Sequence, residues 1–292
     1  MNNQINQVSD TAFMAAAYRA METNRPNALF HDPLAAKLAG ARGKRIIDNL
    51  PKQAFIGGWS VVIRTRIIDD FIQNAILDGV DTILNLGAGL DTRPYRLELP
   101  KSLRWIEVDY PHVIELKETC LCGETPRCQL ERVKLDLANI DARQTLLDNV
   151  EAQSKKVLVL TEAVTPYLSE DAVASLGADL GAHESITYWV VDYFSPASYE
   201  YRRRSGMSKS MKNAPFLFEP EDYFGFFLQS GWKPKETKYF ATEAKRMNRP
   251  APFPLFTKFM MRILGFFASP KRRREMQQYA GFVLFEPAKR AV

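Results

Sequence analysis

A Gly-x-Gly turn at residues 87–89 is the first feature of the sequence that could bind a ligand. It follows the mostly apolar run from Val80 to Leu86, which has the residue types of a buried strand. Where a parallel strand ends on such a turn, the unusual dihedral angles and missing Cβ of glycine let the backbone approach a nucleotide. Gly87, Ala88 and Gly89 are therefore candidate binding residues, although a glycine pair alone also fits an ordinary tight turn.

Acidic side chains stand at the ends of three later apolar runs, at Asp109, Asp136 and Glu162. Asp109 comes about twenty residues after the glycine turn, where a carboxylate, which only accepts hydrogen bonds, can bind both hydroxyls of a ribose. Glu107 lies two residues earlier on the same side of its strand, and it is either an alternative ribose ligand or a buried partner of a helix. Together the turn and the three acidic strand ends predict a polar, nucleoside-like ligand.

The same stretch lacks the signatures of phosphate binding. Thr92 replaces the third glycine of a dinucleotide motif, and there is no Gly-Lys-Ser/Thr phosphate loop. Asp91 stands where a pyrophosphate would meet a helix N-terminus, and its negative charge would repel one. A nucleoside with a cationic group and no phosphate, such as S-adenosylmethionine, fits better than the nicotinamide cofactor of an oxidoreductase.

Arg64 is out of place in the helix predicted over residues 59–78. Apolar residues follow it three, four and seven positions on, so it projects from the edge of the buried stripe. Arg66, by contrast, points along Asp69 and Asp70 on what we expect to be a solvated face. A guanidinium on the inner side requires an anion. The spacing leaves two alternatives open, a salt bridge within the core or the carboxylate or phosphate of a ligand.

The elements that position these residues alternate between strand and helix about five times from residue 80 to residue 194. Strands are expected at residues 80–86, 103–109, 132–137, 156–160 and 185–194. This alternation is typical of a doubly wound α/β sheet, which binds ligands outside the carboxyl ends of its strands. The uninterrupted apolar run Val157–Leu160 fits a central strand that is buried on both faces.

The sequence divides into a helical cap (1–78), a nucleoside-binding core (79–240), an insertion (241–278) and a last strand of the core (279–292). The cap is expected to hold one helix from Ser9 or Asp10 and another from Pro33. The core is expected to close with a helix at residues 219–230 and a strand at residues 232–240. In the insertion, the apolar stretch 253–267 precedes four basic residues, so that 253–274 is a lid, a membrane-surface contact or a helix packed on the core.

The composition is that of a folded globular protein, with 46% hydrophobic and 25% charged residues. The net charge of +5 permits an acidic ligand, but it does not by itself indicate nucleic acid, and we expect no such partner. The three cysteines lack the paired spacing of a zinc site, so no metal is expected, and their odd number fits a reducing compartment. Residues 1–10 lack the features of a signal peptide, and we expect a cytoplasmic protein.

Several motifs, in the same order along the chain, resemble the leucine carboxyl methyltransferase and polyketide O-methyltransferase family. They are Arg19-Ala20, Asp32-Pro33, Arg64-Thr65-Arg66, the stretch 86–93, the stretch 107–111 with Lys117, and Thr161-Glu162 through Tyr167-Leu168. The resemblance implies the seven-stranded, Rossmann-like class I methyltransferase sheet with helices on both faces, and S-adenosylmethionine as the cofactor.

The resemblance also implies roles for individual residues. It favours the ligand alternative for Arg64, which would hold the methionine carboxylate, whereas Leu137 would flank the adenine. No role follows for Arg19, because a lysine also serves in that region of the family. The other implied cofactor-binding positions are Gly87, Ala88, Gly89, Asp109, Asp136 and Glu162.

The implied reaction is direct methyl transfer from the sulfonium to an oxygen. A carboxylate is ionised at neutral pH and requires no general base, whereas a hydroxyl requires one. None of His31, His112 and His183 is a compelling base, which favours an acidic acceptor. Tyr167 is the candidate catalytic residue, because it could hydrogen-bond the acceptor, but its hydroxyl could also be structural. One of the arginines at 202–204 could hold a substrate carboxylate, or all three could form a solvated charge run.

The sequence therefore predicts an O-methyltransferase that acts on a carboxylate or hydroxyl of a small, acidic or partly apolar molecule, polyketide-like or lipid-like. The alternatives are a protein C-terminal carboxyl methyltransferase and a non-catalytic nucleoside-binding scaffold. A weak contact with a membrane surface through residues 253–274 is a further expectation.

Overall fold

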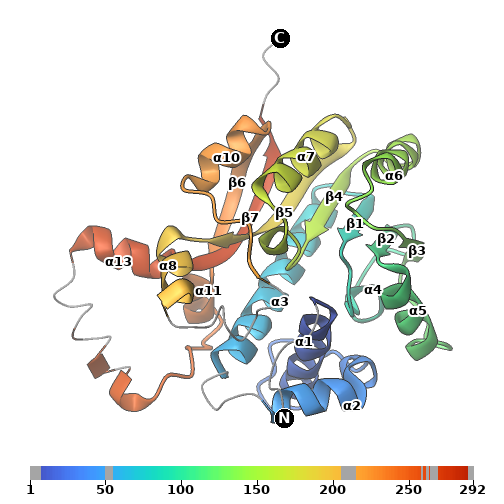
Figure 1. The fold of residues 1–292 in the computed structure, drawn as a ribbon. Helices are drawn as coiled ribbons and strands as arrows, with labels where there is room; N and C mark the ends of the chain where they lie inside the picture. The colour runs from blue at the N-terminus through green and yellow to red at the C-terminus, as the bar shows by residue number, and fades with distance from the viewer. Residues whose placement is uncertain are drawn as a thin grey trace.

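A seven-stranded sheet forms the centre of the molecule in the computed structural model, which describes residues 8–49, 55–204, 215–257, 259, 260, 263 and 269–288. The strand order is β3-β2-β1-β4-β5-β7-β6 (Figure 1). β1 to β5 are parallel to one another, whereas β7 runs antiparallel to both β5 and β6. The predicted Rossmann-like α/β class is confirmed.

Strands and helices alternate along most of the chain. The strands are β1 (Thr82–Leu86), β2 (Arg104–Asp109), β3 (Gln129–Lys134), β4 (Val157–Thr161), β5 (Ile186–Phe194), β6 (Trp232–Tyr239) and β7 (Ala280–Pro287). The helices are α1 (Val8–Thr23), α2 (Ala35–Asp48), α3 (Phe55–Leu77), α4 (Arg93–Arg96), α5 (Pro111–Cys120), α6 (Ile140–Gln153), the 3-10 turn η2 (Thr165–Tyr167), α7 (Glu170–Gly181), α8 (Pro196–Arg204), α10 (Tyr223–Gln229), α11 (Phe240–Arg246) and α13 (Pro270–Gln277).

Two apolar cores cover the two faces of the sheet, because side chains alternate between the faces along each strand. In β4, Val157 and Val159 pack in one core with α6, α7 and α10, whereas Leu158 and Leu160 pack in the other with α3 and α11. Every residue of β1 and β4 is buried. The predicted position of the fourth strand at the centre of the sheet is therefore confirmed.

The N-terminal helices α1 and α2 pack on each other in a third cluster, which also contains Leu90 from the loop after β1. A buried arginine of the C-terminal part, Arg249, ties the insertion to this cap. Arg249 Nη2 lies 3.0 Å from Glu22 Oε1, and Trp59 Nε1 donates a hydrogen bond of 2.9 Å to the Arg249 carbonyl. Arg249 thereby connects the insertion with both α1 and α3.

Several predicted boundaries are wrong, each for a local reason. α1 begins at Val8, so Ser9 and Asp10 lie within the helix rather than at its cap, and Pro33 lies in a turn before α2. β3 ends at Lys134 because its pairing with β2 ends there, opposite Asp109. α10 begins only at Tyr223, where the Asp222 side chain caps it by accepting a hydrogen bond from the Gly225 amide.

Within the part of the insertion that the structure describes lie the helices α11 and α13. The sequence did not predict α11, and α13 covers the basic residues at 271–274. The apolar stretch predicted over 253–267 lies in large part outside the described residues. Among the residues that the structure describes, none forms a helix of the length and apolar character that a membrane crossing requires.

Candidate cofactor site

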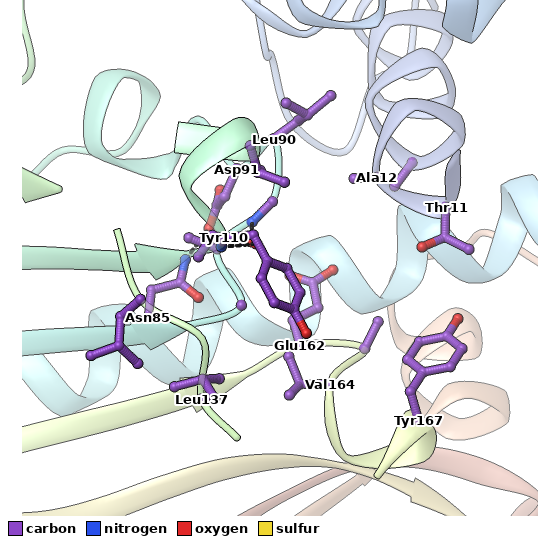
Figure 2. A pocket seen from close by; sticks show the side chains of 18 of the residues that line it. Thr11, Ala12, Asn85, Leu90, Asp91, Tyr110, Leu137, Glu162, Val164 and Tyr167 are labelled. Atoms are coloured by element: carbon purple, nitrogen blue, oxygen red, sulfur yellow. Dashed lines mark hydrogen bonds between the residues drawn. The ribbon is translucent and has the colours of Figure 1, made fainter. Parts of the chain in front are cut away.

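A cavity of about 410 Å³ lies at the carboxyl ends of β1, β2 and β4, against α1 (Figure 2). The loops that follow β1 to β4 supply most of its wall, and α1 and α3 supply the rest. All nine residues predicted from the sequence line this one cavity, namely Arg64, Gly87, Ala88, Gly89, Asp109, Asp136, Leu137, Glu162 and Tyr167. Their binding and catalytic roles stay predictions.

The glycine turn has the backbone conformation that its sequence requires. Gly87 and Gly89 have φ angles of 70° and 45°, in the left-handed region that favours glycine. A Cβ at Gly87 would also clash with Val164 Cγ2. The amides of Gly87 and Ala88 both donate to the Val108 carbonyl, at 2.8 and 3.1 Å, which fixes the turn against β2.

Asp109 stands beside this turn at the end of β2. Its two carboxylate oxygens accept hydrogen bonds of 2.7 Å from the amides of Gly89 and Tyr110. Burial raises the pKa of Asp109 above its usual value. Because a carboxylate oxygen has two lone pairs, each of the two oxygens can accept one more hydrogen bond. Together they can accept the two hydrogen bonds that the hydroxyls of a ribose would donate.

The wall beyond Asp109 combines one acid with apolar groups. Asp136 lies two residues past the end of β3, and its Oδ1 accepts a hydrogen bond of 2.9 Å from the Ala138 amide. Leu137 packs against the core from the same loop. The Tyr110 ring stacks on the His112 ring, with the two centroids 5.8 Å apart. Burial and the Asp136 carboxylate both raise the pKa of the Tyr110 phenol. Neither ring was predicted as part of the site.

Arg64 and Glu162 place opposite charges together on the cavity wall. Arg64 Nε lies 2.9 Å from Glu162 Oε1, and each side chain is about a fifth exposed, 20% and 17%. Burial alone would raise the pKa of Glu162, but the guanidinium groups of Arg93 and Arg64 outweigh this effect and lower it. Arg64 thus forms a salt bridge, but this bridge lies on the cavity wall rather than within the core, and the ligand alternative for Arg64 stays a prediction.

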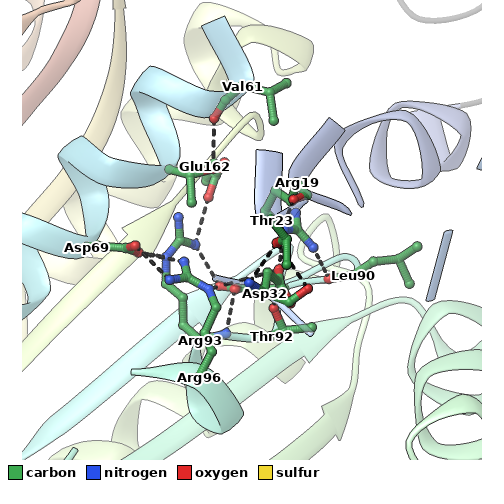
Figure 3. A network of polar contacts seen from close by, with 12 residues as sticks. Arg19, Thr23, Asp32, Val61, Asp69, Leu90, Thr92, Arg93, Arg96 and Glu162 are labelled. Atoms are coloured by element: carbon green, nitrogen blue, oxygen red, sulfur yellow. Dashed lines mark hydrogen bonds and ion pairs between the residues drawn. The ribbon is translucent and has the colours of Figure 1, made fainter. Parts of the chain in front are cut away.

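Arg93 connects Glu162 of the cavity wall with Asp69 of α3 and with Asp91 (Figure 3). Its buried guanidinium lies 2.8 Å from both Asp69 and Asp91 and 2.9 Å from Glu162. Asp69 also pairs with Arg96 at 2.7 Å. The prediction that Asp69 lies on a solvated face is wrong, because α4 packs its two arginines against that face of α3.

Asp91 disfavours phosphate by a different route from the one predicted. Its Oδ1 accepts a hydrogen bond of 2.9 Å from the Arg93 amide, so the donor at the start of α4 is already occupied. Burial would raise the pKa of Asp91, but the neighbouring Arg93 outweighs it and holds the pKa well below its usual range. Because Arg93 compensates the negative charge, the occupied amide rather than net repulsion disfavours a pyrophosphate.

Arg19 attaches α1 to the mouth of the cavity. It donates hydrogen bonds to Asp32 Oδ2 at 2.8 Å and to the Leu90 carbonyl at 2.6 Å, and Thr92 Oγ1 donates to the same Asp32 oxygen. Both charged side chains are buried. Arg19 therefore holds the loop after β1 against the cap.

Glu107 is the buried partner of a helix and is not among the residues that line the cavity. Its oxygens lie 2.7 Å from Lys117 Nζ and 2.9 Å from Arg132 Nε, and the Glu107 and Lys117 side chains are fully buried. The alternative of Glu107 as a ribose ligand is thereby disfavoured.

Tyr167 lies at the end of the cavity near α1, on the side where Thr11 lines it (Figure 2). Its ring packs edge-on against Phe216, with the centroids 5.1 Å apart. Burial raises the pKa of the phenol, so it is a neutral hydrogen-bond donor at physiological pH. Of the three histidines, only His112 lines the cavity.

The three arginines that end α8 differ from one another. Arg202 lies over the rings of Phe194 and Phe216, at 4.7 and 4.1 Å from their centroids, and burial lowers its pKa. Arg203 pairs with Glu219, and Arg204 pairs with Glu200 at 2.6 Å on the surface. The prediction of a solvated charge run is therefore wrong for Arg202, which packs beside the Phe216 ring that contacts Tyr167.

The sheet and its cavity define a Rossmann-like α/β protein with a binding site at the carboxyl ends of its strands, and comparison with known proteins gives the family. Leucine carboxyl methyltransferases match residues 12–180 of the chain. A protein of Streptomyces coelicolor, provisionally named an S-adenosyl-L-methionine-dependent methyltransferase, is 34% identical over 235 residues, which cover 76% of this chain and 82% of the relative. One of Frankia alni with the same description is 31% identical over 255 residues, which cover 84% and 88%.

The fold has a solved counterpart as well. A crystal structure from Thermobifida fusca, provisionally named a methyltransferase, superposes with a TM-score of 0.54 and 14% identity over 97% of this chain and 94% of that one.

The chain belongs to the leucine carboxyl methyltransferase family. It is an S-adenosylmethionine-dependent methyltransferase, and the predicted family and cofactor are confirmed.

Proposed function

We propose that this methyltransferase methylates an oxygen of a small acidic molecule, a carboxylate on a polyketide-like or otherwise partly apolar compound. The observation that carries the proposal is the chemistry at the Tyr167 end of the cavity. There Glu162 is held by two arginines with a lowered pKa, and Tyr167 is a neutral phenol. Neither is suited to remove a proton from a hydroxyl, whereas a carboxylate acceptor requires no base.

The residues of the cavity fit S-adenosylmethionine. Arg64 and Glu162 offer one positive and one negative group for the carboxylate and ammonium of its amino acid part. Asp109 offers two acceptors for the ribose hydroxyls, and Leu137 and Tyr110 offer apolar surface for the base. When bound, the cofactor supplies an electrophilic methyl group on a sulfonium.

The tasks that remain for the chain are to orient the acceptor and to keep water out. The Tyr167 hydroxyl can donate a hydrogen bond to a carboxylate oxygen of the acceptor. Thr11 and Ala12 of α1 cover the cavity beside it. Alignment of two reactants in a closed site removes much of the entropic part of the barrier, without any acid or base.

The first test is calorimetry with S-adenosylhomocysteine, which requires no acceptor. Arg64→Ala is expected to weaken binding by roughly 10- to 100-fold, because a charge-assisted contact is lost. Arg66→Ala is the matched control, since Arg66 lies on the same helix but pairs with Asp70 at 2.8 Å and is not among the residues lining the cavity. Equal affinities for the two variants would contradict the assignment of Arg64.

The second test is methyl transfer to pairs of compounds that carry either a carboxylate or a hydroxyl on the same skeleton. Transfer to the acids alone supports the proposal, whereas transfer to the hydroxyl compounds alone contradicts it. Because the matching family is that of leucine carboxyl methyltransferases, a peptide with a C-terminal leucine belongs in the panel. Cofactor binding with no transfer to any acid would favour the scaffold alternative.

A further inference from the structure

Ala163 has an unfavourable backbone conformation at the cofactor cavity. Its φ angle is 56°, in the left-handed region, where a residue with a Cβ is disfavoured. It stands between Glu162 and Val164, and all three residues line the cavity. A strained residue between two wall residues persists only where its surroundings hold it.

Asp192, on the neighbouring strand β5, provides that hold. Its Oδ2 accepts a hydrogen bond of 2.7 Å from the Ala163 amide. The side chain is buried and is not among the groups that line the cavity, and the proposed reaction does not use it. Burial raises the pKa of Asp192 to about 7, even though Arg64 and the Ala163 amide favour the charged form. A buried carboxyl without a catalytic task requires another explanation.

We infer that Asp192 is a positioning residue of the cofactor site. By holding the Ala163 amide, it keeps Glu162 beside Arg64 and Val164 above the glycine turn. The inference rests on the cofactor site proposed above, and it assigns to β5 a part in cofactor binding.

The dissociation constant of S-adenosylhomocysteine, measured by calorimetry, tests this role. Asp192→Ala removes the acceptor and is expected to weaken binding about tenfold. Asp192→Asn retains a side-chain oxygen for the Ala163 amide and is expected to restore most of the affinity. In an Ala163→Gly background the left-handed conformation is no longer strained. Asp192→Ala should therefore raise the dissociation constant less in this background than in the unmodified chain.

Val191→Ala is the matched control, because Val191 is buried on the same strand and contributes only to the apolar core. It should lower the melting temperature and leave the dissociation constant unchanged. The inference is overturned if Asp192→Ala binds as tightly as the unmodified chain, or if Asp192→Asn binds as weakly as Asp192→Ala. No binding by the unmodified chain would overturn the cofactor site as well.

A second and independent feature is the charge of the insertion. Residues 244–274 contain nine lysines and arginines and no acidic residue. Arg246 and Arg249 are used internally, in ion pairs with Asp70 and Glu22. The four basic residues of α13 at 271–274 are exposed, and α13 buries no residue.

Large apolar side chains are exposed on the same part of the chain. Leu255, Phe256 and Phe259 are 85%, 74% and 60% exposed. Figure 1 places this segment and α13 outside the sheet and its covering helices, on the same side of the molecule. Exposed aromatic residues and a basic cluster on the same side of a molecule can bind an anionic membrane surface together, because the charges attract the headgroups and the apolar groups enter the interface.

The geometry points to an anionic lipid surface as the partner of the exposed Leu255, Phe256 and Phe259 side chains and of α13. The test is co-sedimentation of the full chain with phosphatidylcholine vesicles, with and without phosphatidylserine. Binding is expected only to the anionic vesicles. Arg272→Ala with Arg274→Ala should weaken it about 30-fold, at roughly fivefold for each charge near the surface.

The matched control removes two exposed charges elsewhere, Lys101→Ala with Lys155→Ala, and should leave vesicle binding unchanged. Phe256→Ser with Phe259→Ser should also weaken binding to the anionic vesicles. Failure to bind anionic vesicles overturns the proposal. Binding that depends on the arginines but not on the phenylalanines also overturns it, in favour of a soluble polyanion.

Discussion

At the scale of single residues, the turn requires glycine at position 87 for two separate reasons. Gly87 has a positive φ angle, and the space that its Cβ would occupy is filled by Val164 from the loop after β4. The positive φ angle is a property of the turn itself, whereas the contact with Val164 arises only because β1 and β4 are neighbours in the sheet. The turn and the Glu162 loop therefore fit each other as two halves of one wall.

Gly87→Ala tests this fit. The substitution is expected to weaken S-adenosylhomocysteine binding at least tenfold, because Val164 or the turn must move. Gly79→Ala is the control, since Gly79 also has a positive φ angle, 88°, but its Cβ would meet open space. That variant should lose only about 1–2 kcal/mol of stability from the left-handed conformation and keep its affinity. Calorimetry and thermal denaturation of both variants give the comparison, and equal affinity losses would contradict the role of Val164.

At the scale of elements, α1 is a wall of the cavity that is attached through buried polar contacts as well as through apolar packing. Asp32 accepts hydrogen bonds from Arg19 of α1 and from Thr92 after the glycine turn. Removal of one partner from a buried pair leaves the other charge uncompensated, which costs roughly 3–5 kcal/mol. The attachment of α1 therefore depends on Asp32.

Asp32→Asn is expected to destabilise the cap more than the sheet. Amide hydrogen exchange should accelerate over residues 8–23 and change little in β1 and β4. Glu124→Gln is the control, because Glu124 pairs with Lys37 at 2.7 Å on the surface, where such a pair contributes about 0–1 kcal/mol. Uniform acceleration across the sheet in Asp32→Asn would show that the cap and sheet unfold together.

The sequence predicts most of the sheet and its site because both leave local signals. Alternating apolar runs mark the strands, and a glycine turn or an acidic residue marks the strand ends that face the cavity. The network around Arg93 has no such signal, since helical spacing groups Asp69 with Arg66 but does not say that α4 will cover that face. Asp192 likewise lies inside an apolar strand, and only the neighbouring position of β4 reveals its contact with Ala163.

At the scale of the whole molecule, buried carboxyl groups make opposite contributions to stability with pH. Arginines lower the pKa of Asp69 and Glu162 against the effect of burial, so their contribution is present above the ordinary carboxyl pKa of about 4 and is lost as the pH falls. Burial raises the pKa of Asp192 to about 7, so its contribution is present below about 4 and is lost as the pH rises toward 7. The balance predicts maximal stability at mildly acidic pH.

Asp192→Asn isolates the second contribution. The titratable and charged groups that face Asp192 are Arg64, Glu162, Tyr167 and Tyr223, from α3, the loop after β4, η2 and α10, and this substitution leaves all of them in place. The melting temperature of the variant should rise relative to that of the unmodified chain by several degrees between pH 5 and pH 8. A difference that stays constant over this range would show that Asp192 does not titrate there.

The position of β7 between β5 and β6 has a consequence for synthesis on the ribosome. β6 pairs with β7 alone among the described strands, and β7 is the last of them in the chain. Until residue 287 has emerged, the nascent chain must therefore carry an unpaired β6 and an open edge on β5, both of which invite wrong pairing. A premature stop even a few codons upstream of β7 should consequently yield chains that aggregate rather than shortened enzymes.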